Sequence, residues 1–158
     1  MKTLKFYLML TPLLLLLPSG VFAADTVFRF TVDKPITQIY DKLYKAMEDA
    51  HFYIVFEPDI GRNLASFAER WGEDYNRSHL DAIRAMVFCN GWYANQAANR
   101  DPDMLALCPQ HLTLIESHGK TTALYARPTV IAADSPARKV LSELEDGVIA
   151  AIKKGMRD

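Results

Sequence analysis

Two amphipathic helical patterns enclose a run of strand patterns, and this order constrains the fold more than any other feature of the sequence. Apolar residues recur every three or four positions from Ile36 to Met47 and again from Val140 to Ile152, which predicts one helix in each stretch. Strand patterns occupy residues 25–32, 51–56, 82–89, 111–116 and 121–126. The sequence therefore predicts a single α+β domain in the order strand–helix–four strands–helix, with the helices packed on one face of a largely antiparallel sheet.

The connections between these elements are less regular. Helical spacing from Leu64 to Trp71 is followed by a polar stretch that favours a loop, and residues 92–100 favour a short helix. Trp71, Tyr75, Trp92 and Tyr93 stand beside these connections. Aromatic side chains of this kind line a pocket or cover the edge of a core. If they line a cleft, we expect it between the Trp92 segment and residues 62–79.

The first 23 residues are typical of a cleavable secretory signal peptide. Lys2 and Lys5 precede an apolar run over residues 6–17, and Val21 and Ala23 supply the small side chains that signal peptidase requires. The run is shorter than the ~20 residues of a membrane-spanning helix. We therefore expect an exported protein without a stable membrane anchor, located in the periplasm if the source is Gram-negative and secreted otherwise.

Removal of this segment changes the charge of the chain. Loss of Lys2 and Lys5 leaves 16 basic residues against 19 acidic ones in a mature domain of residues 24–158. A net negative charge argues against nucleic acid as a partner, because phosphate binding relies on a clustered cationic surface. It argues against docking on anionic lipid for the same reason.

Cys89 and Cys108 are the only cysteines in the sequence. An exported protein meets an oxidising compartment, where a disulfide between them is our first interpretation. It would close a loop of roughly 20 residues and stabilise the fold by about 3 kcal/mol. A free buried pair and a reactive or metal-binding thiol pair are the alternatives.

The same cysteines belong to the one group of residues with metal or redox chemistry. His111 follows Cys108 by three positions, and Met104 precedes it by four. Sulfur and imidazole ligands suit copper or zinc, and an imidazolium can also lower a thiol pKa. Core packing explains Met104 and His111 equally well. No Gly-x-Ser-x-Gly, HExxH, CxxC or phosphate-binding glycine motif is present, so the sequence predicts no catalytic residues and no cofactor beyond these two metals.

Three stretches resemble the DUF302 family, a family of small domains of unknown function. They run from Ile39 to Phe52, from Val87 to Ala97, and from Asp101 to Arg127. The resemblance implies a fold akin to that of the TATA-binding protein, and homo-oligomerisation, for example as a homodimer. It implies no reaction. The chain departs from the family pattern at His51, at Gly91 and in the order of Cys108 and Pro109, which bears directly on how the two cysteines are placed.

Our leading hypothesis is a non-enzymatic exported module that binds a small molecule or a periplasmic protein. The candidate binding residues are Cys89, Asn90, Trp92, Cys108 and His111. One alternative is a thiol- or metal-dependent carrier or redox protein that uses Cys89, Cys108 and His111. Another is a structural subunit of a periplasmic assembly.

Overall fold

The computed structural model describes residues 26–157, so the predicted signal peptide lies outside the described residues. Five strands form one antiparallel sheet in the order β1-β5-β4-β3-β2. The elements are β1 Val27–Val32, α1 Ile36–Asp49, β2 Tyr53–Phe56, α2 Ile60–Ala65, α3 Ala68–Trp71, η1 Gly72–Asp74, β3 Ala82–Cys89, α4 Gly91–Ala98, η2 Pro102–Leu107, β4 Gln110–Ser117, β5 Lys120–Ala126, α5 Pro128–Ile131 and α6 Arg138–Arg157. The predicted α+β class and the order strand–helix–four strands–helix are confirmed.

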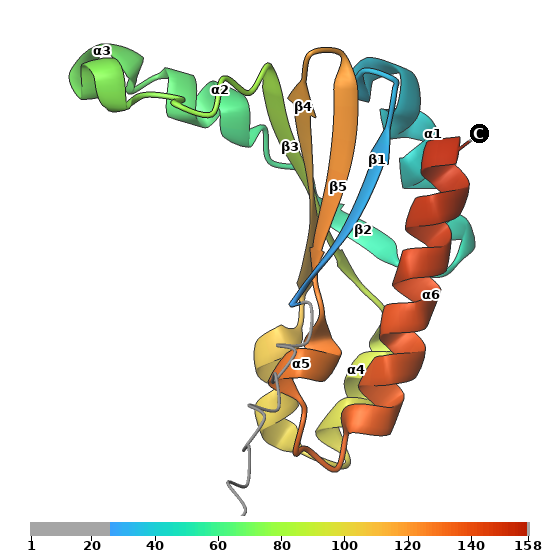
Figure 1. The fold of residues 1–158 in the computed structure, drawn as a ribbon. Helices are drawn as coiled ribbons and strands as arrows, with labels where there is room; N and C mark the ends of the chain where they lie inside the picture. Colours follow the sequence, from blue (N-terminus) through green and yellow to red (C-terminus); the bar gives the residue numbers. More distant parts are fainter. Residues whose placement is uncertain (1–25, 158) are drawn as a thin grey trace, which may run out of the picture.

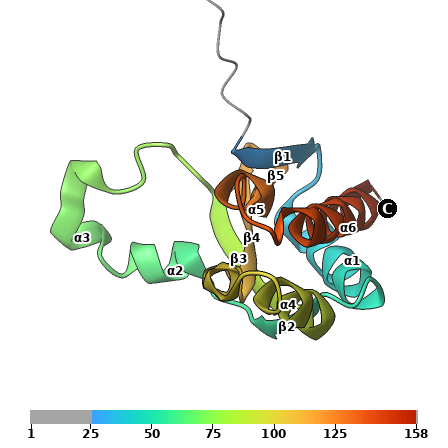
Figure 2. The same cartoon turned by 90° about the horizontal axis from the view of Figure 1, so that it is seen from below.

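Helices α1 and α6 lie side by side over one face of the sheet (Figures 1 and 2). Each buries the apolar side that its sequence period predicts. The sheet contributes the inward side chains of its central strands, among them Met86, Phe88, Leu112, Leu114 and Tyr125. Burial of these large side chains holds the two layers together.

An aspartate just before a helix often caps it through its side chain, but Asp33 does not do so for α1. Asp33 forms an exposed ion pair with Lys120 at 2.7 Å and does not cap the helix. The N-cap position is Pro35, which provides no side-chain cap. Instead, Glu116 Oε2 on β4 accepts a hydrogen bond from the backbone N–H of Ile36 at 2.8 Å. A carboxylate from the sheet thus satisfies one of the free N–H groups of the helix terminus.

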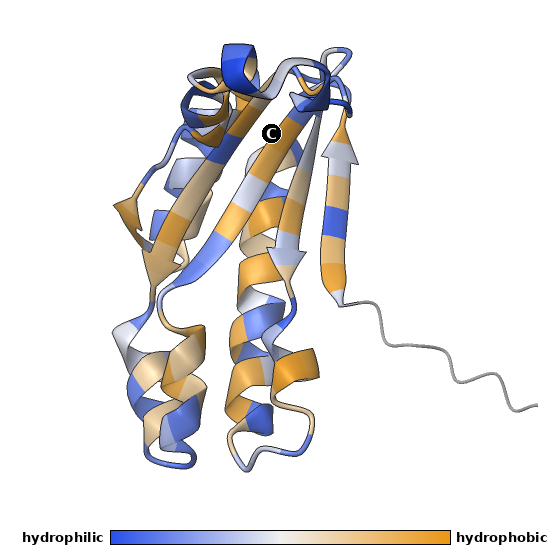
Figure 3. Cartoon of the chain, turned by 90° about the vertical axis from the view of Figure 1, so that its left-hand side faces the viewer, coloured by the Kyte–Doolittle hydropathy of each residue, from blue (hydrophilic) through white to orange (hydrophobic). Residues whose placement is uncertain are grey.

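The opposite face of the sheet is covered by no helix in the described part of the chain (Figure 3). Strand register places the side chains that alternate with the core residues on this face. Its three cross-strand rows are Val27, Ala126, His111 and Val87; Arg29, Leu124, Thr113 and Ala85; and Thr31, Thr122, Ile115 and Ile83. We call these rows the open face.

Residues 60–81 leave the sheet as an arm. Figures 1 and 2 both show α2 and α3 projecting from the sheet on the side away from α1 and α6. The predicted helical stretch from Leu64 to Trp71 is divided into two short helices, which break around Ser66 and Phe67. No residue of α2, α3 or η1 is buried.

The other end of the sheet carries α4, η2, α5 and the first turns of α6. A small second cluster of Ala97, Ala132, Ala137 and Leu141 packs there, with Met104 and Leu107 against it. Helix α5 follows β5 directly and begins at Pro128, and it was not predicted from the sequence. No helix among the described residues is long and apolar enough to cross a membrane.

Candidate functional site

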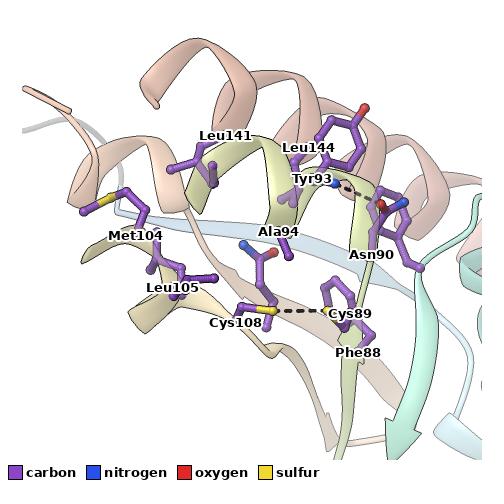
Figure 4. Close-up of a pocket in the computed structure, with 14 residues that line it drawn as sticks. Phe88, Cys89, Asn90, Tyr93, Ala94, Met104, Leu105, Cys108, Leu141 and Leu144 are labelled. Carbon is purple, nitrogen blue, oxygen red and sulfur yellow. Dashed lines mark hydrogen bonds between the residues drawn. The ribbon is translucent and has the colours of Figure 1, made fainter. Parts of the chain in front are cut away.

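A recess with mainly apolar walls lies between α4, η2 and α6 at the end of β3 (Figure 4). Its cavity volume is about 20 Å³, which is space for about one water molecule. We call it the cysteine pocket. Its walls are Phe52, Phe88, Cys89, Asn90, Tyr93, Ala94, Ala97, Met104, Leu105, Leu107, Cys108, Gln110, Leu141 and Leu144.

Aromatic rings form one side of the cysteine pocket. The rings of Phe52 and Tyr93 are stacked with centroids 6.5 Å apart, and Phe52 meets Phe88 edge-on at 5.9 Å. Phe88 belongs to strand β3, whereas Tyr93 belongs to helix α4. The arrangement provides a wall that favours contact with another flat, apolar group.

Asn90 is the N-cap of α4. Its side-chain oxygen accepts a hydrogen bond from the N–H of Tyr93 at 3.2 Å, and its amide nitrogen donates to the carbonyl of His51 at 3.1 Å. Both the oxygen and the nitrogen of the Asn90 side-chain amide therefore form hydrogen bonds within the fold. It fixes where α4 begins, and so where Tyr93 and Ala94 stand in the pocket wall.

Cys89 and Cys108 point toward one another in the wall of the pocket (Figure 4). Their sulfur atoms are 3.1 Å apart, compared with about 2.05 Å in a disulfide. Both are free thiols in this structure, so the predicted disulfide is not formed. Burial, followed by the hydrogen bond and the charge of Cys89, raises the pKa of Cys108 to about 11. Without a bound metal, this pKa disfavours the thiolate form of Cys108 at neutral pH.

The other predicted ligands do not converge on the thiols. Met104 lines the same pocket, but it lies at the end far from Cys89 in Figure 4. His111 is exposed and belongs to the open face, on the side of the sheet away from the core. Among residues 26–157, no group of three or more His, Cys, Asp or Glu side chains could hold a metal ion. The combination predicted for copper or zinc is therefore not assembled.

Trp92 also lies outside the cysteine pocket. Its side chain is 67% exposed and borders a separate cavity of about 220 Å³ together with Arg100 and Lys139. The expected cleft between the Trp92 segment and residues 62–79 is wrong, because the arm and α4 stand at opposite ends of the molecule in Figure 1. Strand β3 separates them: the arm enters it at Ala82 and α4 leaves it after Cys89.

The family model for the domain of unknown function DUF302 matches residues 28–156. The chain belongs to the DUF302 family. A crystal structure of an uncharacterised conserved DUF302 protein from Bacillus stearothermophilus is similar in fold, with a TM-score of 0.71 over 84% of this chain and 99% of that one. The two sequences are 15% identical, so this similarity concerns the fold. No curated protein matches the sequence.

Membership in the DUF302 family confirms the resemblance derived from the sequence, and it assigns no reaction. Of the predicted binding residues, Cys89, Asn90 and Cys108 line the pocket, as does Met104, which was predicted only as a metal ligand. The pocket walls that come from other segments were not predicted. Leu141 and Leu144 belong to the inner face of α6, and Phe52 precedes β2. The helical period of α6 could show that these leucines are buried, but not which segment they cover.

Proposed function

We propose that this DUF302 protein is an exported, non-enzymatic binding module whose cysteine pocket takes a small, neutral aromatic molecule. The observation that carries the proposal is the pocket lining, in which three aromatic rings and five leucine or methionine side chains surround few polar groups. Ligand pockets in proteins share this composition. A flat ligand would extend the stack of Phe52 and Tyr93.

Entry of such a ligand requires part of the wall to move, because the cavity of about 20 Å³ is smaller than an aromatic ring. Among the segments that form the pocket wall, η2 would lose the least buried contact if it moved. It has no buried residue, and Leu105 on it is 47% exposed. At its start, Asp101 caps the helix and accepts a hydrogen bond from Ser135. At its end stands Cys108.

The cysteine pair then controls the mobility of η2. Oxidation by a small disulfide, such as glutathione disulfide, would remove two protons and two electrons from Cys89 and Cys108 and release two thiols of the oxidant. The resulting bond would tie the end of η2 to β3 and hold the pocket closed. Reduction by a dithiol would reverse the reaction and let η2 move away.

Indole is a suitable probe, and saturation-transfer NMR detects its binding. We expect binding to the reduced protein and loss of that binding in Ala94→Phe, because the new ring fills the pocket. Asn95→Phe is the matched control, since it places the same ring at an exposed position of α4 and should leave binding intact. Absence of indole binding to the reduced protein, or equal binding by Ala94→Phe, would overturn the binding proposal.

The thiol control has a separate test. After treatment with glutathione disulfide, a protein in which Cys89 and Cys108 are joined should bind indole at least tenfold more weakly than the reduced form. The double variant Cys89→Ser, Cys108→Ser has no thiol that can react with glutathione disulfide, so it should bind indole equally under both conditions. Equal indole binding by the oxidised and reduced wild-type protein would contradict this control while leaving the pocket itself in place.

A further inference from the structure

A second cavity lies at the base of the arm, away from the cysteine pocket. Its volume is about 530 Å³, which falls within the range of roughly 300–1,000 Å³ that small-molecule sites have. Its walls come from the outgoing limb of the arm, from the returning limb and from the start of β3. Figures 1 and 2 show how these two limbs leave the sheet and rejoin it. We call this space the arm cavity.

Aromatic and aliphatic side chains form part of the wall of the arm cavity. Trp71 and Tyr75 line it, and Leu64 and Leu80 add aliphatic surface. Phe67 stacks on Trp71 with ring centroids 5.1 Å apart and does not border the cavity, so it supports the indole ring from outside. The face of an aromatic ring attracts a cation, and an apolar chain packs against the same surface.

Three carboxylates also line the arm cavity, one from each of its walls: Asp59, Asp74 and Asp81. They outnumber the one basic side chain of the lining, Arg62. One oxygen of Asp59 accepts a hydrogen bond from the backbone N–H of Arg62 at 2.9 Å. One oxygen of Asp81 accepts from the backbone N–H of His118 at 2.8 Å. Within residues 26–157, the second oxygen of each carboxylate forms no hydrogen bond or ion pair, so it can accept a hydrogen bond from a ligand.

The positions of these carboxylates distinguish between kinds of cation. Among residues 26–157, no three His, Cys, Asp or Glu side chains are placed so that they could hold a metal ion together. An extended molecule with several cationic groups does not need its partners at one point. Primary and secondary ammonium groups also carry N–H donors for the free carboxylate oxygens, which a quaternary ammonium lacks.

We propose that the arm cavity binds an aliphatic polyamine. The ammonium groups donate hydrogen bonds to Asp59, Asp81 and Asp74, and the methylene chain between them lies against Trp71. Asp74 is paired with Arg77 at 3.2 Å, but both side chains are exposed, so a ligand can replace Arg77 at little cost. This site is separate from the cysteine pocket and does not depend on the ligand proposed there.

A bound polyamine ties the arm to the body of the domain. Asp59 forms a backbone bridge to β3, and the N–H of Asp81 donates to a carbonyl of β4, so the sheet fixes both residues. Asp74 belongs to the arm, whose helices have six residues or fewer and bury none of them. Helices of this length are unstable alone, because a few hydrogen bonds do not offset the cost of nucleation. A ligand that contacts all three carboxylates therefore makes the arm more rigid.

Spermidine is the probe, and isothermal titration calorimetry on the purified protein measures its binding. Asp59→Asn and Asp81→Asn each remove a charge but keep an oxygen that accepts the hydrogen bond within the fold. Each should weaken spermidine binding about tenfold, because a charged hydrogen bond becomes a neutral one. Glu73→Gln is the matched control, since it removes a charge from an exposed position of the arm outside the cavity lining and should leave the affinity unchanged.

Two further variants and a second readout sharpen the test. Arg62→Gln removes the basic side chain of the lining and should strengthen spermidine binding. Ala94→Phe, which fills the cysteine pocket, should bind spermidine as the wild type does. Hydrogen exchange of the amides of residues 60–81 should slow when spermidine is added.

Three results would overturn the polyamine site. The first is a wild-type protein that does not bind spermidine. The second is a loss of affinity in Glu73→Gln equal to that in Asp59→Asn and Asp81→Asn, which would mean general attraction to an acidic surface. The third is weaker binding by Arg62→Gln, because a cation site cannot depend on a guanidinium.

Discussion

Gly155 of α6 lies directly against Leu43 of α1. A Cβ atom at position 155 would stand 2.5 Å from the Cα of Leu43, which is closer than any real contact of this kind. Glycine at this position lets the two helix backbones approach. The close packing of α1 and α6 over the sheet therefore requires a residue without a Cβ atom at position 155.

Gly155→Ala should destabilise the protein by about 1–3 kcal/mol, since the backbone of α1 must move to admit the methyl group. Gly91→Ala is the control. A Cβ at position 91 would meet nothing within 4 Å, and its φ is not in the left-handed region, so the change should be neutral or slightly stabilising. Urea unfolding followed by circular dichroism measures both. Equal stability of the two variants would show that the helices are not in this close contact.

The regular elements could be predicted because each buries one side against the core. Apolar side chains alternate along β3, and they recur with a helical period in α1 and α6. These patterns predicted the three elements, and the structure confirms them. The arm could not be predicted in the same way. Its helices bury nothing, so no apolar period marks where they begin, end or break.

The candidate site was predicted in part. The approach of Cys89 and Cys108 follows from the pairing of β3 with β4, because both cysteines stand just beyond the pair Phe88 and Gln110. His111 lies outside the pocket because successive side chains of β4 point to opposite faces of the sheet, and His111 points to the open face. What the sequence could not show was the strand order. The distance between the arm and Trp92 follows instead from the length of the predicted strand over residues 82–89, which lies between them.

Leu144→Asp should prevent accumulation of folded protein. Leu144 is 6% exposed and belongs both to the core and to the wall of the cysteine pocket. A carboxylate there would be buried without a partner, which costs a large part of the roughly 5–15 kcal/mol that stabilises a domain. Ala150→Asp, on the exposed side of the same helix, should leave yield and melting temperature nearly unchanged. A normal yield of Leu144→Asp would place that side chain outside the core.

Glu145 should make the stability depend on pH. Burial alone would raise its pKa, but hydrogen bonds from Thr129 and Arg127 outweigh burial and hold the pKa below its usual value. A lowered pKa in the folded state means that the ionised carboxylate stabilises the fold at neutral pH. This contribution is lost as the pH falls below the unfolded-state value and through the folded-state one.

Glu145→Gln tests this contribution. At pH 7 the variant should lose about 2 kcal/mol, because charged hydrogen bonds from Arg127 and Thr129 become neutral or are broken. The difference from wild type should shrink progressively below about pH 4.5, where the unfolded carboxylate is protonated. Glu143→Gln, at an exposed position of the same helix, should show little effect. A stability difference that stays constant from pH 7 to pH 3 would contradict the role of the charge.

Cys108 should react slowly with alkylating reagents in the reduced, folded protein. Its pKa is raised to about 11 by burial, and then by the hydrogen bond and charge of Cys89. Only the thiolate attacks iodoacetamide, and a pKa of about 11 in place of about 9 lowers the thiolate fraction at pH 8 by about 100-fold. Mass spectrometry of the peptide that contains Cys108 measures the rate, with urea-unfolded protein as the reference. The rate in folded protein should continue to rise with pH up to about 11, whereas a plateau near pH 9 would mean that the Cys108 thiol is neither buried nor paired with Cys89.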